Sequence, residues 1–421
     1  MRVDLRYGEG SLPLELSDRF SIEQVVPQTV TKHPNIDSEL LRVIESPVDS
    51  LPFSQRVSEV DSIVVVVNRI EQPALMVELL YSLLNSVETF SFNPDNVSII
   101  YPVSSEERVS KTEVDNLLGN PESRGHFLVL HNPDTKSALE VVGETPSYST
   151  PVHVNEHYLS ADMKIGLSEI RPDVFYGATG GRMSVIPSVS GIKTITRNAK
   201  LRATGDTGQF KLDTSSCIDM LETTQLAGLD FIVNSVSDWQ GNVAHIVAGD
   251  PYSSWKSGVN SAISLARADY SKRADIAIVS AGGKPHDTTL YDSIDSLYSA
   301  CEATEHGGSI VLVAECSEEA GPKGFIRGMS EFASENDVLT ASETNFEIGF
   351  EKARFFWTVL SSRNVVICSR LRDSLVEERL HCTAVKDPQE GLEVAQGMLA
   401  SSKKIAILND GLRTTPKLTN H

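Results

Sequence analysis

A glycine-rich segment at residues 173–198 has the residue types best suited to binding an anion. It reads DVFYGATGGRMSVIPSVSGIKTITRN, with Thr179 before the paired Gly180 and Gly181, and Arg182 directly after them. Glycines let backbone N–H groups approach a negative charge closely, and the arginine adds a full positive charge. The segment predicts an anion-binding loop or, on composition alone, a glycine-rich surface turn.

A second polar segment, SAGGKPHD at residues 280–287, follows an apolar run and precedes a helical pattern. Ligands of open α/β sheets bind beyond the carboxyl ends of strands, which is where Lys284, His286 and Asp287 stand. These side chains are therefore candidates for a site. The alternative is that Asp287 caps a helix that begins near Thr288.

The common signatures of catalysis and cofactor binding are missing. No GxGxxG follows a strand pattern, and GxxxxGK[ST], HExxH and GxSxG do not occur. The one histidine pair at i,i+4, His153 and His157, follows the Pro151 turn, which favours surface or hydrogen-bonded histidines over a metal site. Any metal ligands stay unknown at this level.

Apolar runs rich in β-branched residues alternate with helical patterns, and these elements must position the polar segments. Most runs are continuous, which is typical of parallel strands covered on both faces. A charged stretch at 266–274 marks a boundary, so we expect a larger α/β domain at 1–268 and a Rossmann-like α/β domain at 269–421. The polar tail from Arg413 is expected to be frayed. Expected strands are Ser62–Val67, Val97–Pro102, Phe127–His131, Phe231–Val236, Ile276–Ser280, Ser309–Ala314, Val365–Ser369 and Lys404–Leu408, and expected helices are Ala74–Ser86, Lys111–Leu118, Ser257–Ala268, Thr288–Thr304 and Gly349–Ser361.

The composition excludes several partners. With 37 Lys+Arg against 57 Asp+Glu, the chain has a formal charge of −20 at pH 7, which argues against a nucleic-acid or anionic-membrane partner. The five scattered cysteines include no CxxC pair and suit reduced thiols. No apolar run has the length of a membrane span, and the first residues lack the apolar core of a signal peptide. We therefore expect a cytoplasmic protein with a small-molecule ligand.

Several separated blocks of the sequence resemble one known family. The string PVHVNEHYLSADMKIGLSEIRPDVFYGATGGRMSVIPSVSGIKTITRN at 151–198 closely resembles the signature region of the nickel-dependent lactate racemases. Similar blocks are RYGEGSLPLELS near the start, FIVNSVSDWQGNVAHIVAGD and SAGGKPHDTTLYDSIDSLYSACEATEHGGSIVLVAE. The resemblance implies two α/β domains with a cleft between them. It also implies a 2-hydroxy-acid racemase or epimerase that uses a nickel pincer nucleotide tethered to a lysine, with histidines exchanging the hydroxyl proton.

Matched to that family motif by motif, the chain keeps the scaffold and changes residues that the reaction uses. The histidine before the glycine loop falls on Asp173, the tether lysine on Met183, and a nickel-ligand histidine on Ala199. A thioether cannot form the thioamide tether. Three further motifs of the family also change here, and they fall on Arg69–Pro73, Val103–Glu106 and Tyr291–Asp295.

These substitutions leave three hypotheses: an active racemase with altered residues, a member that binds a different small polar ligand, and a noncatalytic paralogue. The prediction is a lactate racemase-like protein with an impaired nickel-pincer mechanism and a cleft of mixed or acidic charge. If Arg69, Glu106, Asp292 and Asp295 face that cleft with Asp173 and Arg182, they would hold a polar ligand or close the cleft by salt bridges. The residues expected at the site are Asp173 and Tyr291 as catalytic groups, with Thr179, Gly180, Gly181, Arg182 and Lys284 as cofactor or anion contacts.

Overall fold

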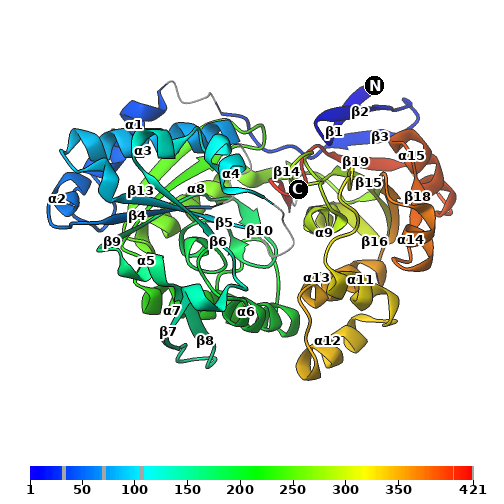
Figure 1. Ribbon diagram of the computed structural model, residues 1–421. Coiled ribbons are helices and arrows are strands. Elements are labelled where there is room, and N and C mark those ends of the chain that lie inside the picture. The colour runs from blue at the N-terminus through cyan, green and yellow to red at the C-terminus, as the bar shows by residue number, and fades with distance from the viewer. Residues whose placement is uncertain (31–34, 69–72, 104–108, 402, 420–421) are drawn as a thin grey trace.

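The computed structural model describes residues 1–30, 35–68, 73–103, 109–401 and 403–419. Within them the chain forms two α/β bodies side by side, each built on a six-stranded sheet (Figure 1). This architecture confirms the predicted α/β class with parallel sheets. No helix of the described residues is long and apolar enough to cross a bilayer.

The first sheet has the order β13-β12-β9-β4-β5-β6, and only β13 is antiparallel to its neighbour. Strand β4 is apolar throughout because both of its faces are buried. Ile63, Val65 and Val67 pack into one core, while Val64 and Val66 pack into another on the opposite face. The strands are β4 (Ile63–Val67), β5 (Val97–Pro102), β6 (Phe127–His131), β9 (Met163–Glu169), β12 (Phe231–Ser237) and β13 (Val243–Gly249). The helices of this body are α1 (Ile36–Glu45), α2 (Phe53–Val57), α3 (Pro73–Thr89), α4 (Lys111–Leu117), α5 (Glu156–Ser160), α6 (Ile192–Thr204), α7 (Ser215–Ala227) and α8 (Ser253–Ala266).

The second sheet is parallel throughout, in the order β18-β17-β16-β15-β19-β3. Its strand β15 also feeds two cores, because Ala277 and Val279 face one side and Ile276 and Ile278 face the other. The strands are β3 (Ser21–Gln24), β15 (Ala274–Ser280), β16 (Thr304–Val313), β17 (Asn364–Cys368), β18 (Thr383–Val385) and β19 (Lys404–Leu408). The helices are α9 (Leu290–Ser293), α10 (Ser296–Ala303), α11 (Lys323–Ser330), α12 (Glu335–Thr344), α13 (Phe350–Leu360), α14 (Asp373–Glu378) and α15 (Pro388–Gly397).

The ends of the chain cross between the bodies. Strand β3 pairs with β19 of the second sheet, although the sequence assigned all residues up to 268 to the first domain. The hairpin of β1 (Arg2–Tyr7) and β2 (Gly10–Glu15) packs on the same sheet through Val3, Leu5 and Leu14. Near the other end, β14 (Arg267–Tyr270) pairs with β20 (Thr415–Leu418). The remaining hairpins are β7 (Leu139–Glu144) with β8 (Pro151–Asn155) and β10 (Pro172–Asp173) with β11 (Gly177–Ala178).

Two expectations about secondary structure are wrong. The tail is not frayed from Arg413, since Arg413 is 6 % exposed, Thr414 is 1 % exposed, and the next four residues form β20. The helix expected at Thr288–Thr304 is two short helices, α9 and α10, because Thr289 caps the first and the chain turns again before Ser296. The expected strands at Val97–Pro102, Phe127–His131 and Lys404–Leu408 are confirmed with the same bounds.

Candidate functional site

A cavity of about 700 Å³ lies between the two bodies. The β1–β2 hairpin contributes Arg6 and Glu9 to its wall, and the loop after β15 contributes Lys284. Charges of both signs therefore line the space, so it suits a polar ligand better than an apolar one. The other lining residues are Gly8, Gly10, Pro73, Met76, Tyr101, Leu117, Gly282, Gly283 and Pro285.

The SAGGKPHD loop holds the hairpin turn against this cavity. The Lys284 amide donates to the Gly8 carbonyl at 2.9 Å, and its exposed ammonium donates to Glu9 Oε1 at 3.1 Å. Asp287 is fully buried and accepts hydrogen bonds from the amides of Gly8 at 2.6 Å and Glu315 at 3.1 Å. The helix-cap interpretation of Asp287 is wrong, because Thr289 caps α9 and accepts from the Asp292 amide.

The glycine loop is buried, and its polar groups are largely engaged within the first body. Gly180 and Gly181 have positive φ angles of 84° and 49°, which a side chain would strain. The Gly181 amide donates to Asn234 Oδ1 at 3.0 Å. The Thr179 hydroxyl donates to the Glu169 carbonyl at 2.8 Å, and the Thr179 carbonyl accepts from the indole of Trp255 at 2.8 Å. These contacts position the loop at the end of β9.

Arg182 points into the first body. Its side chain is 6 % exposed, and Nη2 donates to the Tyr176 carbonyl at 2.7 Å. Its guanidinium carbon lies 4.3 Å from the centre of the Trp255 ring, a cation–π contact. Burial lowers the pKa of this guanidinium, which nevertheless stays a cation. Arg182 is not among the residues that line the interdomain cavity.

A cluster of charges joins the bodies beside the glycine loop; we call Asp173, Tyr291, Asp295, Glu351 and Lys352 the interdomain charge cluster. The Lys352 ammonium lies 2.7 Å from Asp295 Oδ1 and donates to the Tyr291 carbonyl at 2.8 Å. It also lies 4.4 Å from the centre of the Tyr291 ring. Burial raises the pKa of Asp295, and the charge of Asp173 in the first body adds to that shift. The cluster thus brings together Asp173, Tyr291 and Asp295, which the sequence singled out.

Hydrogen bonds fix the orientation of the two predicted catalytic side chains. Asp173 Oδ1 accepts from the amides of Phe175 at 2.8 Å and Tyr176 at 2.7 Å, which closes the turn between β10 and β11. The Tyr291 hydroxyl donates to Glu351 Oε1 at 2.5 Å. Burial and the Glu351 carboxylate hold the pKa of Tyr291 well above its usual range, so this phenol stays protonated and can donate a hydrogen bond.

The stability of the protein is expected to depend on the ionisation of Asp295. Burial raises the pKa of Asp295 to about 6, while Lys352 opposes that shift. A carboxyl group whose pKa is higher in the folded state than in the unfolded state stabilises the fold at low pH, and the benefit is lost as pH rises through about 4 to 6. In urea titrations across this range, wild type should lose stability relative to Asp295→Asn by up to about 1.4 kcal/mol per pH unit. A constant difference between the two proteins would contradict this assignment.

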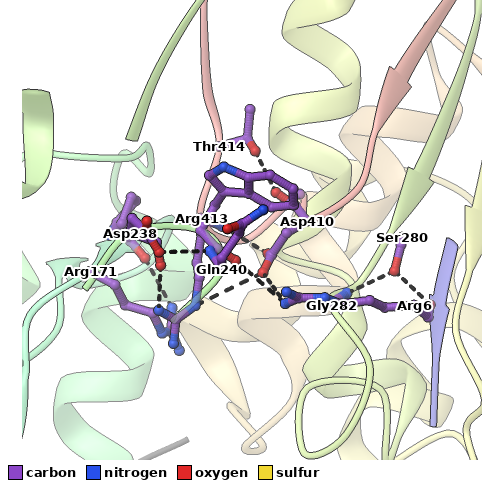
Figure 2. Close-up of polar contacts among 12 residues, drawn as sticks. Arg6, Arg171, Asp238, Gln240, Ser280, Gly282, Asp410, Arg413 and Thr414 are labelled. Carbon is purple, nitrogen blue, oxygen red and sulfur yellow. Dashed lines mark hydrogen bonds and ion pairs between the residues drawn. The ribbon is translucent and has the colours of Figure 1, made fainter. Parts of the chain in front are cut away.

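A buried network around Arg413 forms a second link between the bodies (Figure 2). Its guanidinium makes two hydrogen bonds to Glu169 at the end of β9, at 3.0 and 3.2 Å, and a third to the Asp238 carbonyl at 3.3 Å. Asp410 lies beside it and also pairs with Arg6 of the hairpin at 3.5 Å. Burial raises the pKa of Asp410, and the nearby Arg413, His286 and Arg6 oppose the shift. The network ties the cavity-lining Arg6 to the first sheet.

The other sequence candidates are Asp292, whose charge adds to that of Asp295 in raising the pKa of Lys352, and two residues outside the described ranges. Asp292 is exposed and accepts a hydrogen bond from the Thr289 hydroxyl. Arg69 and Glu106 fall in the ranges 69–72 and 104–108, outside the described residues. Among the side chains that the structure describes, no three His, Cys, Asp or Glu residues are grouped as a metal site.

The sequence did not reveal several residues of the interdomain cavity, the interdomain charge cluster and the Arg413 network. Lys352, Glu351 and Arg413 carried no local signal, because each is defined by a partner far away in the chain. Arg6 and Glu9 did carry one, since they lie in the block RYGEGSLPLELS that takes part in the family resemblance.

Comparisons with known proteins point to lactate racemases in both halves of the chain. The model of the lactate racemase N-terminal domain matches residues 7–209, and that of the lactate racemase C-terminal domain matches residues 270–415. Lactate racemases of Thermoanaerobacterium thermosaccharolyticum and Lactiplantibacillus plantarum are each 23 % identical to this chain, over 97 % of it and 98 % of their own length.

Two solved structures share the fold. The lactate racemase apoprotein of Thermoanaerobacterium thermosaccharolyticum matches with a TM-score of 0.87 and 22 % identity, covering 99 % of this chain and 100 % of that one. A Thermotoga maritima protein matches with a TM-score of 0.68 and 12 % identity, covering 92 % of this chain and 100 % of its own. At these identities the structural likeness concerns the arrangement of the elements.

Proposed function

Because the chain belongs to the lactate racemase family, we propose that it is a lactate racemase-like protein whose interdomain cavity binds a small hydroxy acid or a related carboxylate, with the nickel-pincer mechanism impaired. One observation carries the proposal: the cavity between the bodies keeps Arg6 and Lys284 as cations, whereas the positions matched to the tether and a nickel ligand are Met183 and Ala199. The scattered cysteines, all unpaired, support a cytoplasmic location.

The residues at the matched positions do not fit a lysine-tethered nickel pincer nucleotide. Met183 has no amine to form the thioamide, and Ala199 is a fully buried methyl group in α6. The Asp173 carboxylate, where the family has a histidine, is held by two backbone amides of its own turn. Three roles that the family mechanism needs are therefore without a suitable side chain.

The cavity supplies what a small hydroxy acid needs for binding. The exposed ammonium of Lys284 and the guanidinium of Arg6 offer charge-assisted hydrogen bonds to a carboxylate. Glu9, which pairs with Lys284, can accept a hydrogen bond from a hydroxyl group. Met76 and Tyr101 give the opposite wall an apolar surface for a short carbon chain.

The test measures cofactor loading, racemisation and binding on one preparation. The protein is produced together with a cofactor-synthesis pathway, and its intact mass and nickel content are determined. D- and L-lactate are then incubated with it and separated by chiral chromatography, and lactate binding is measured by calorimetry. Lactate racemase from Thermoanaerobacterium thermosaccharolyticum serves as the positive control.

We expect a bare-chain mass, no stoichiometric nickel, no racemisation and saturable lactate binding. The Lys284→Gln variant should bind about tenfold more weakly, since it loses a charge-assisted contact, whereas Lys272→Gln at an exposed position should bind as wild type does. Racemisation at a rate near that of the control would overturn the impaired mechanism. If the protein shows neither racemisation nor lactate binding, the result would favour a noncatalytic paralogue that has another partner.

A further inference from the structure

A smaller cavity of about 140 Å³ lies beside the glycine loop, within the first body. It is bounded by the short helix η4 (Gly181–Ser184), by α7 and by the start of α8. Arg182, Leu229 and Trp255 line it, and Gln225 stands exposed at its rim. None of these residues lines the interdomain cavity, so the two spaces have separate walls.

Arg182 brings an incompletely satisfied cation to this cavity. Only one of its terminal nitrogens, Nη2, makes hydrogen bonds among the described residues, to the Tyr176 carbonyl at 2.7 Å and to Cys217 Sγ at 3.4 Å. Its Nε is buried and has no hydrogen-bond partner. A buried donor without a partner costs free energy, and a ligand with paired acceptor oxygens would remove that cost.

The other walls favour a small organic anion. The Trp255 ring covers the guanidinium and is held by its hydrogen bond to the Thr179 carbonyl. Asp250 also lines the cavity, but its Oδ1 accepts from the amides of Tyr252 at 3.1 Å and Ser253 at 2.8 Å, so its charge is partly offset by the start of α8. Leu221 and Leu229 add apolar surface.

We propose that this cavity is a second ligand site, which binds a short-chain monocarboxylate through Arg182 and packs its carbon chain against Trp255 and Leu229. A cavity of about 150 Å³ accommodates a molecule of the size of benzene, which sets the scale of the ligand. The carboxylate would pair with the Arg182 guanidinium, and Leu221, Leu229 and Trp255 would contact its carbon chain. The site is independent of the function proposed for the interdomain cavity.

The test titrates butyrate into the full-length protein by calorimetry at low ionic strength. Two rim variants change charge without touching the core: Gln225→Lys should tighten binding about threefold, and Gln225→Glu should weaken it about threefold. Arg182→Gln should abolish binding, with circular dichroism to check that it folds. Lys272→Gln, at an exposed position outside both cavities, should leave butyrate binding unchanged, and in Lys284→Gln the binding that the Gln225 variants shift should persist.

A second readout locates the ligand. In the Trp239→Phe/Trp357→Phe variant Trp255 is the one remaining tryptophan, and butyrate should change its fluorescence with the same midpoint as the calorimetric titration. Loss of butyrate binding in Lys284→Gln, together with no effect of either Gln225 variant, would assign the binding to the interdomain cavity and overturn the proposal. The absence of saturable binding at millimolar butyrate would also overturn it.

Discussion

Replacing Arg413 with Met is expected to lower the free energy of unfolding by about 3–5 kcal/mol. The Arg413 guanidinium is 6 % exposed and makes two hydrogen bonds to Glu169, whose side chain is 4 % exposed. Without Arg413 the Glu169 carboxylate keeps its burial and loses its counter-ion, and an uncompensated buried charge is far more costly than a missing surface contact. Urea unfolding followed by tryptophan fluorescence measures the loss.

Two further variants distinguish the cost of leaving a buried charge without a partner from the cost of losing any ion pair. Arg2→Met removes the pair of Arg2 with Asp4, whose side chains are 62 % and 56 % exposed, and should cost less than about 1 kcal/mol. The double variant Arg413→Met/Glu169→Leu removes this ion pair as a whole and should recover part of the stability, because Asp410 keeps its contact with Arg6. If Arg413→Met alone unfolds at the same urea concentration as wild type, the network does not hold the bodies together.

Replacing Lys352 with Met is expected to cost about 3–5 kcal/mol at pH 8 and clearly less at pH 5. At pH 8 the variant leaves the Asp295 carboxylate buried beside Asp173 without the ammonium that lies 2.7 Å away in wild type. Burial raises the pKa of Asp295 to about 6, so at pH 5 that group is largely protonated in either protein and the ion pair has already been lost. Urea unfolding at the two pH values gives the comparison.

The exposed Lys272→Met variant is the matched control and should change little at either pH. The double variant Lys352→Met/Asp295→Asn should be more stable at pH 8 than Lys352→Met, because it removes the stranded charge. An equal loss at pH 5 and pH 8 would show that Lys352 acts through the contacts of its ammonium with the Phe175 and Tyr291 rings rather than through its ion pair with Asp295.

The sequence predicts the strands well where each forms an uninterrupted apolar run. Strand β4 is of this kind, because all its residues are buried and apolar and they pack into cores on both faces of the sheet. Strand β9 lies at the centre of the first sheet and escaped prediction, since Lys164 and Gly166 interrupt its run. Gly166 is needed there, because a Cβ would lie 2.3 Å from the Ser184 hydroxyl oxygen.

The candidate site was less predictable than the fold, because its geometry comes from pairs of residues far apart in the sequence. The family resemblance placed Asp295 in an altered motif, but only the structure shows that the Lys352 ammonium lies against it. The residue types predicted Arg182 as an anion contact, but they did not indicate that its side chain points into the first body, away from the interdomain cavity. The direction in which a side chain points depends on how its loop packs, and the spacing of residues along the sequence does not reveal that packing.

The pairing of β3 with β19 restricts how this protein can be divided. A fragment that begins at residue 269 would lack β3 and the β1–β2 hairpin, so β19 would become an unprotected sheet edge with its neighbouring apolar face uncovered. Such an edge favours association with other chains over folding as a monomer. Evolutionary exchange of one half for a homologous half would therefore have to carry the first residues of the chain along with the second body.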